Sequence, residues 1–131
     1  MQHSIKTTKE DELIDITHIV RQEVEKSGVL EGMVVVFIPH TTAGVTINEN
    51  ADPDVKHDIL LGLRKSFPKD SHYLHGEGNS HAHIKASMMG SSCTVFIENG
   101  RLKLGTWQGI YFCEFDGPRT RKCEVKILKS M

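Results

Sequence analysis

The chain has 131 residues, with 16 basic and 17 acidic side chains and a formal net charge of −1. A chain of this length usually forms one domain around one core, so residues 1–131 are predicted to be a single domain. No run of lysine or arginine marks a nucleic-acid-binding surface, and no apolar stretch approaches the roughly 18 residues of a membrane span. We therefore expect neither nucleic acid nor membrane as a partner.

The cysteines, Cys93, Cys113 and Cys123, are odd in number and form no CxxC pair. This pattern is atypical of a disulfide framework or a zinc knuckle. No apolar block near the N-terminus resembles a signal peptide. Together these features predict a reducing, cytoplasmic location.

The first third of the chain reads as short strands around one helix. Residues 3–8 and 13–16 are predicted strands that pair with each other. A short amphipathic helix should follow, with Thr17 as its N-cap and Gly28 as its stop. Residues 33–38, MVVVFI, are apolar on both faces, which is typical of a central strand.

A strand and the longest helix come next. Residues 45–50, VTINEN, alternate between two faces, so Glu49 shares its face with apolar side chains. Asp52 and Pro53 form a cap and a first helical position, and apolar residues then recur at helical spacing until Pro68.

The last third is dominated by strand patterns. Residues 93–97 should pair through an Asn99-Gly100 turn with the residues that follow, and residues 110–115 and 122–128 should form two further strands. Strands with two or three inserted helices indicate an α+β fold with a mainly antiparallel sheet.

Residues 72–90 hold half of the eight histidines: His72, His75, His81 and His83. As a strand, this segment would place His81 and His83 on one side, the usual geometry for metal chelation. As a helix that begins after Asn79 or Ser80 and stops at Gly90, it would bury Ile84 and Met88 and turn the two histidines apart by about 200°. The helix is favoured because alanine and methionine dominate the segment.

Three stretches together resemble one known family. They are HTTAGVTINENADPDVKHD from His40, YLHGEGNSHAHIKASMMG from Tyr73, and GRLKLGTWQGIYFCEFDGPRTRK from Gly100. In this order and spacing they are similar to the YjbQ-like family, an uncharacterised protein family also labelled secondary thiamine-phosphate synthase. The resemblance covers nearly the whole chain.

The resemblance implies a β-sandwich of about seven strands with two to three inserted helices, assembled as a homotrimer. It also implies a weak or incidental thiamine phosphate synthase activity, in which a pyrimidine diphosphate condenses with a thiazole phosphate and releases pyrophosphate. A small phosphorylated metabolite is then the expected partner.

The family's recurring polar positions and the chemistry of the side chains nominate the site residues. Candidate catalytic residues are His40, Glu49, His83, Lys85 and Glu114. Candidate substrate-binding residues are Thr41, Asn48, Asn79, Ser87, Trp107, Gln108 and Arg119.

The histidines allow two interpretations. His40, His75 and His83 could hold a divalent metal ion, such as Zn, Mn, Ni or Mg, with Glu49 as a further ligand. The same imidazoles could instead donate hydrogen bonds to a phosphate without any metal. In both interpretations the three rings and Glu49 are predicted to meet in one pocket.

Other candidates also have a structural alternative. Glu49 is a general base or a carboxylate paired at the edge of the core. Trp107 would either stack on a heteroaromatic ring, with Gln108 hydrogen-bonded to the edge of that ring, or fill a contact in the core or between subunits. Lys85 and Arg119 would stabilise departing pyrophosphate. A non-catalytic protein that binds a metal or a phosphorylated metabolite remains the alternative to an enzyme.

Overall fold

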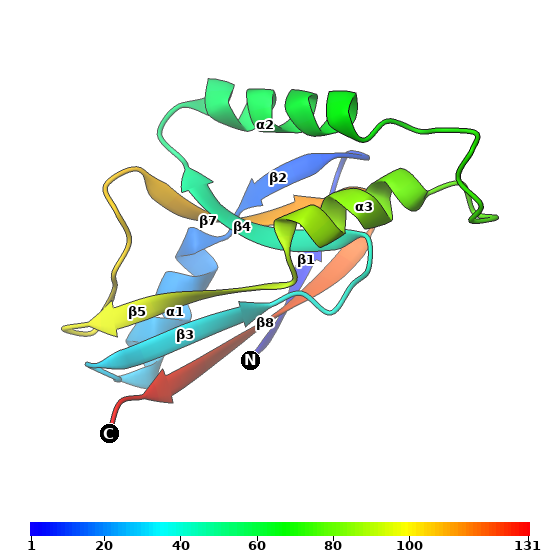
Figure 1. Ribbon diagram of the computed structural model, residues 1–131. Helices are drawn as coiled ribbons and strands as arrows, with labels where there is room; N and C mark the ends of the chain where they lie inside the picture. Colours follow the sequence, from blue (N-terminus) through cyan, green and yellow to red (C-terminus); the bar gives the residue numbers. More distant parts are fainter.

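The computed structural model describes residues 1–131 as eight strands and three helices (Figure 1). The strands are β1 (Gln2–Lys6), β2 (Glu12–Asp15), β3 (Gly32–Phe37), β4 (Ala43–Glu49), β5 (Ser92–Glu98), β6 (Arg101–Leu102), β7 (Gln108–Glu114) and β8 (Thr120–Lys129). The helices are α1 (Thr17–Ser27), α2 (Pro53–Ser66) and α3 (Ser80–Met89). All strand pairs are antiparallel, which confirms the predicted α+β class. None of the helices is long and apolar enough to cross a membrane.

Two sheets face each other across the main core. One has the strand order β1-β8-β3-β5-β6 and the other β2-β7-β4. β3 lies at the centre of the larger sheet, as its apolar sequence predicts, and buries Val34 and Val36 toward the smaller sheet. α1 adds Val20 and Val24 to this core. The result is a sandwich that leaves one face of each sheet for other contacts.

Helices α2 and α3 cover the other face of the smaller sheet (Figure 1). Leu13, Phe115 and the two small residues Ala82 and Ala86 are buried there. Since the small residues are one helical turn apart, α3 approaches the sheet closely. Gly44 of β4 allows this approach, because a Cβ at that position would lie 2.6 Å from the carbonyl oxygen of Gly90.

Two predictions about the N-terminal third are wrong. The strands predicted at residues 3–8 and 13–16 do not pair, since β1 pairs with β8 and β2 pairs with β7. Their buried side chains belong to different cores, Ile5 to the main one and Leu13 to the second. Thr17 is not the N-cap of α1, because Ile16 holds that position and the Thr17 hydroxyl accepts a hydrogen bond from the Ile110 amide.

The helical interpretation of residues 80–90 is confirmed, but its predicted buried stripe is wrong. Met88 is 65% exposed, whereas His81 and Lys85 are buried beside the two alanines. The alanines set the rotation of α3, because only small side chains fit against the sheet. This rotation decides which polar residues share a cavity.

Candidate functional site

A polar hollow of about 710 Å³ lies where β3 ends and the β7–β8 turn approaches the start of α3. We call it the histidine pocket. Its polar lining comes from the segment after β3 (His40, Thr41, Thr42), from the loop before α3 and its first turn (His75, Glu77, Asn79, His83), from Ser91, and from the β7–β8 turn with the start of β8 (Asp116, Arg119, Arg121). Segments far apart in the sequence therefore meet in one cavity.

His40 is held in one orientation. It follows Pro39, which lacks an amide N–H, at the point where β3 has ended. Its Nε2 accepts a hydrogen bond of 2.9 Å from the Lys122 amide. Burial, followed by the positive charge of Arg121, lowers the pKa of His40. His40 is therefore neutral at pH 7, with its proton on Nδ1 and available to a ligand.

His75 and His83 form a pair inside the pocket. Their ring centroids are 5.5 Å apart and the rings are nearly perpendicular, at 89°. His83 lies in the first turn of α3, and Asn79 before it donates a 2.9 Å hydrogen bond from Nδ2 to Asp116 Oδ2. This bond ties the histidine loop to the β7–β8 turn.

Glu114 and Arg121 form a buried ion pair behind the pocket. Arg121 Nε lies 2.9 and 3.1 Å from the two carboxylate oxygens, and Arg121 Nη2 donates to Thr42 Oγ1 at 2.8 Å. Burial raises the pKa of Glu114, but hydrogen bonds from Arg121, the Asp116 amide and Thr7 outweigh it and hold the pKa below its usual value. Glu114 is anionic and both of its oxygens accept hydrogen bonds. It is therefore better suited to holding Arg121 in place than to transferring a proton.

Arg119 lies at the rim, half-exposed. Its Nη2 bonds Asp116 Oδ2 at 2.9 Å and its Nε bonds the Asp116 carbonyl oxygen at 3.0 Å. Ser87 borders an adjoining hollow that shares His40 and His83, and its hydroxyl donates to the His83 carbonyl oxygen. The pocket therefore presents imidazole, guanidinium and hydroxyl donors, with Glu77 and Asp116 as its carboxylates.

The structure does not bring Glu49, Asn48, Trp107 and Gln108 to this pocket within one chain. Ala43 pairs with Glu114 at the pocket end of the β4–β7 ladder, and Glu49 pairs with Gln108 at the other end. At about 3.3 Å per residue, the two ends are about 20 Å apart. Gln108 Oε1 accepts a hydrogen bond from the Gly105 amide, so its side chain holds a turn there.

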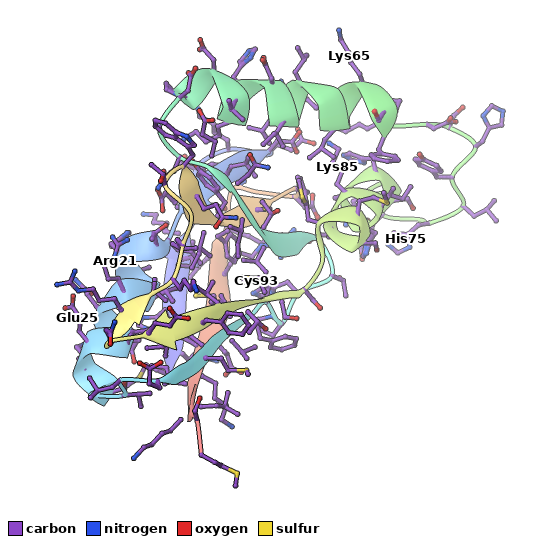
Figure 2. All side chains as sticks on the ribbon, turned by 60° about the vertical axis from the view of Figure 1, so that its left-hand side comes forward. Arg21, Glu25, Lys65, His75, Lys85 and Cys93 are labelled. Carbon is purple, nitrogen blue, oxygen red and sulfur yellow. The ribbon has the colours of Figure 1, made fainter.

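Lys85 also lies outside the histidine pocket. It is on the opposite side of α3, where Nζ lies 3.2 Å from Asp11 Oδ2. Figure 2 shows Lys85 in the space between α2 and α3, whereas His75 lies on the other side of α3.

The three histidines share a cavity without forming a metal centre. No three His, Cys, Asp or Glu side chains are arranged to hold one ion. The lone pair of His40 Nε2 is already used by the Lys122 amide. A three-histidine metal site would require His40 to give up this hydrogen bond.

Arg121, Glu77 and Asp116 also line the pocket but are not among the site residues named from the sequence. The signal for Arg121 was available, because it shares the inward face of β8 with Cys123 and Val125. An arginine among inward-facing apolar residues requires a buried partner. Glu77 and Asp116 lie in turns, where no alternation of apolar and polar residues indicates which side chains point inward.

A family model described as UPF0047 protein YjbQ-like matches residues 1–130. The chain belongs to this family. It is 57% identical to UPF0047 protein YugU of Bacillus subtilis over 126 residues, which is 95% of each chain. It is 54% identical to UPF0047 protein MJ1081 of Methanocaldococcus jannaschii, covering 97% of this chain and 92% of the relative.

Solved structures of the family share the fold. A crystal structure of an uncharacterized conserved protein of the YjbQ/UPF0047 family from Clostridium acetobutylicum has a TM-score of 0.96 and 66% identity, and the match covers 98% of this chain and 99% of that one. A YbjQ-like protein of Sulfolobus solfataricus has a TM-score of 0.95 at 34% identity, covering 99% and 96%.

Proposed function

We propose that this protein is a small enzyme that binds a phosphorylated metabolite in the histidine pocket. The observation that supports this most directly is that one cavity collects three imidazoles, the guanidinium groups of Arg119 and Arg121, and the hydroxyls of Thr41 and Ser91. Guanidinium and imidazole groups are strong donors to phosphate oxygens. The buried ion pair of Arg121 with Glu114 positions one of these donors in advance.

The proposed reaction resembles that of thiamine phosphate synthase. The C–O bond between the pyrimidine methylene and its diphosphate breaks, the thiazole nitrogen forms a C–N bond to that carbon, and pyrophosphate leaves. Arg119, Arg121 and the pocket histidines would stabilise the charge on departing pyrophosphate. The support for this reaction is the family resemblance together with the anion-binding character of the pocket.

The test is an assay of the purified protein with the pyrimidine diphosphate, the thiazole phosphate and Mg²⁺. We expect thiamine phosphate and pyrophosphate to form in equal amounts and only when both precursors are present. Arg119→Gln should lower kcat/KM by about 10²-fold or more, because it removes a donor that stabilises developing charge. No product above background would contradict the proposed reaction.

Binding without turnover is the second candidate function. A non-catalytic carrier of a phosphorylated metabolite would use the same donors, since capture needs only the pocket. Turnover far below the usual range of about 1 to 10³ per second, together with saturable binding of the thiazole phosphate, would favour this alternative.

A divalent metal ion is the other proposed occupant of the pocket, with Zn, Mn, Ni or Mg as candidates. The close pair of His75 and His83 beside His40 supports it, although His40 would first have to release the Lys122 amide. Elemental analysis of the purified protein tests it. About one metal per chain, lost in His83→Ala, would support a metal site, and a metal-free active protein would contradict it.

We also propose a cytoplasmic homotrimer. Met33 pairs across strands with both Phe96 and Leu128, and these side chains are 38%, 60% and 47% exposed on the outer face of the larger sheet. Phe37 lies four residues further along β3, where it is also exposed and lines the histidine pocket. Such a contiguous apolar patch is typical of a subunit interface. The free cysteines suit a reducing compartment.

Native mass measurement tests the assembly. We expect a threefold mass for the wild-type protein, and smaller species for Phe96→Lys, which places a charge in the proposed interface. Gln22→Lys, on the exposed surface of α1, is the matched control and should stay trimeric. A monomeric wild-type protein would contradict the proposal.

A further inference from the structure

A second cavity, of about 410 Å³, lies between α2 and α3 on the side away from the histidine pocket. It shares no lining residue with that pocket. Its ionisable side chains come from the segment before β2 (Glu10, Asp11), from the end of α2 and just beyond it (Arg64, Lys69), and from α3 (His81, Lys85). We call it the lysine pocket.

His81 is buried in this cavity without a hydrogen-bond partner. It is only 5% exposed, and neither of its ring nitrogens makes a hydrogen bond. The nearest carboxylate oxygen, Glu10 Oε1, is 3.5 Å from Nε2 and does not form a hydrogen bond with it. Buried polar groups are nearly always paired in native proteins, so an unpaired imidazole in a cavity wall indicates a missing partner.

Lys85 and Asp11 also have unused bonding capacity. Lys85 is 2% exposed, and its ammonium donates one hydrogen bond, to Asp11 Oδ2. An ammonium has three protons, so two remain. The other oxygen, Asp11 Oδ1, is buried with no partner. The cavity therefore holds an unfilled acceptor beside several unfilled donors.

The balance of charge favours an anion. Arg64, Lys69 and Lys85 are cationic, while Glu10 and Asp11 are anionic, so the pocket has a formal charge of +1 with His81 counted as neutral. The two exposed cations are held loosely. Arg64 Nη1 is 3.8 Å from Asp11 Oδ2, and Lys69 Nζ is 3.4 Å from Glu10 Oε1. Both can turn toward a ligand at small cost.

We propose that the lysine pocket is a binding site for hydrogen phosphate or for the singly charged form of a small phosphomonoester, each of which carries one P–OH group. The ligand must accept hydrogen bonds from His81, Lys85 and Arg64 and also donate one to Asp11 Oδ1. Hydrogen phosphate does both, because it carries one P–OH group. Sulfate and ionised carboxylates only accept, so they would leave the Asp11 oxygen unpaired and facing another negative charge.

The test is calorimetric titration of the His83→Ala protein in a phosphate-free buffer. This background removes one donor of the histidine pocket, and the substitutions described next show which of the two pockets holds the bound phosphate. We expect saturable binding of inorganic phosphate, with sulfate at least about tenfold weaker because one charged hydrogen bond is lost. No binding at about 10 mM phosphate, or equal affinity for sulfate, would overturn the proposal.

Three further substitutions in the same background locate the site. Lys85→Met and Arg64→Gln should each weaken phosphate binding by about tenfold or more, and the exposed position of Arg64 makes the second variant safe for folding. Asp11→Asn should abolish the preference for phosphate over sulfate. His57→Ala, on the exposed surface of α2, is the control. Unchanged binding in both Lys85→Met and Arg64→Gln would overturn the assignment.

Glycerol 3-phosphate, titrated near pH 6, where about half of its phosphate groups still carry a proton, distinguishes the two sources of phosphate. Tighter binding than inorganic phosphate would identify a phosphorylated metabolite as the occupant, because the walls formed by Phe67 and Pro68 would contact its carbon chain. Tighter binding of inorganic phosphate would identify the free ion. Failure of both, with synthase activity intact in the wild-type protein, would reject the lysine pocket alone.

Discussion

Helix α3 carries two histidines, two positions apart, into opposite environments. His83 lies in an open hollow, edge to face with His75, whereas His81 is buried on the other side beside Lys85. Positions i and i+2 of a helix diverge by about 200°, so one HxH motif serves two cavities. If the same His-Ala-His sequence formed a strand, both imidazole rings would lie on one side of that strand.

The supports behind the two cavities also differ. The buried pair of Glu114 and Arg121 behind the histidine pocket is fully hydrogen-bonded. In the lysine pocket Lys85 bonds only one oxygen of Asp11, so the other oxygen and the nearby His81 imidazole have no partner. A satisfied network supports a site that is formed in advance. An unsatisfied network indicates a site that a ligand completes.

The largest expected effect on stability concerns the histidine pocket. Glu114→Gln should lower the free energy of unfolding by about 3–5 kcal/mol, because it leaves Arg121 buried without its counter-charge. Arg119→Gln, in the half-exposed pair with Asp116, should cost less than about 1 kcal/mol. Urea unfolding measures both. Equal losses would show that the buried pair does not support the pocket.

The corresponding change in the lysine pocket should be milder. Lys85→Met should cost about 1–3 kcal/mol, because Arg64 stays within 3.8 Å of Asp11 and the methionine can pack against Phe115. Thermal unfolding adds a sharper comparison, since phosphate should raise the Tm of the wild-type protein by more than that of the variant, which keeps only the histidine pocket. The same increase in both proteins would contradict a role for Lys85 in binding.

The pH dependence of stability tests the lowered pKa of His40. The pKa of His40 is lowered in the folded protein, while the unfolded chain takes up this proton near the ordinary histidine pKa of 6.5. The unfolded state then binds more protons below pH 6.5, so the contribution of His40 is complete above that pH and is lost as the pH falls. His40→Gln should have a flatter profile between about pH 7 and 5 in urea unfolding. Identical slopes would contradict the lowered pKa.

The smallest effect is expected at the far end of the β4–β7 ladder. Glu49→Gln should change synthase kcat/KM by less than about threefold, because Glu49 lies about 20 Å from the histidine pocket in one chain. A complete loss of activity, with the trimer intact, would show that a neighbouring subunit brings its Glu49 to the pocket. The same assay on Trp107→Ala would then show whether Trp107 of the neighbouring subunit also reaches the pocket.

The sequence predicted much of the fold and one part of the site. Strand β3, helix α2 and the convergence of His40, His75 and His83 followed from apolar patterns and family motifs. The position of Glu49 did not follow, because alternation tells which face of a strand a residue occupies and not which end of the sheet it reaches. The rotation of α3 did not follow either, since it depends on how closely Ala82 and Ala86 pack on the sheet.

We propose that the histidine pocket performs the chemistry. The most direct measurement is the synthase kcat/KM of His83→Ala compared with His57→Ala, which removes an exposed imidazole on α2. We expect His83→Ala to lower kcat/KM by about 10²-fold or more and His57→Ala to keep the wild-type kcat/KM. Activity within a few-fold of wild type in His83→Ala would contradict the claim.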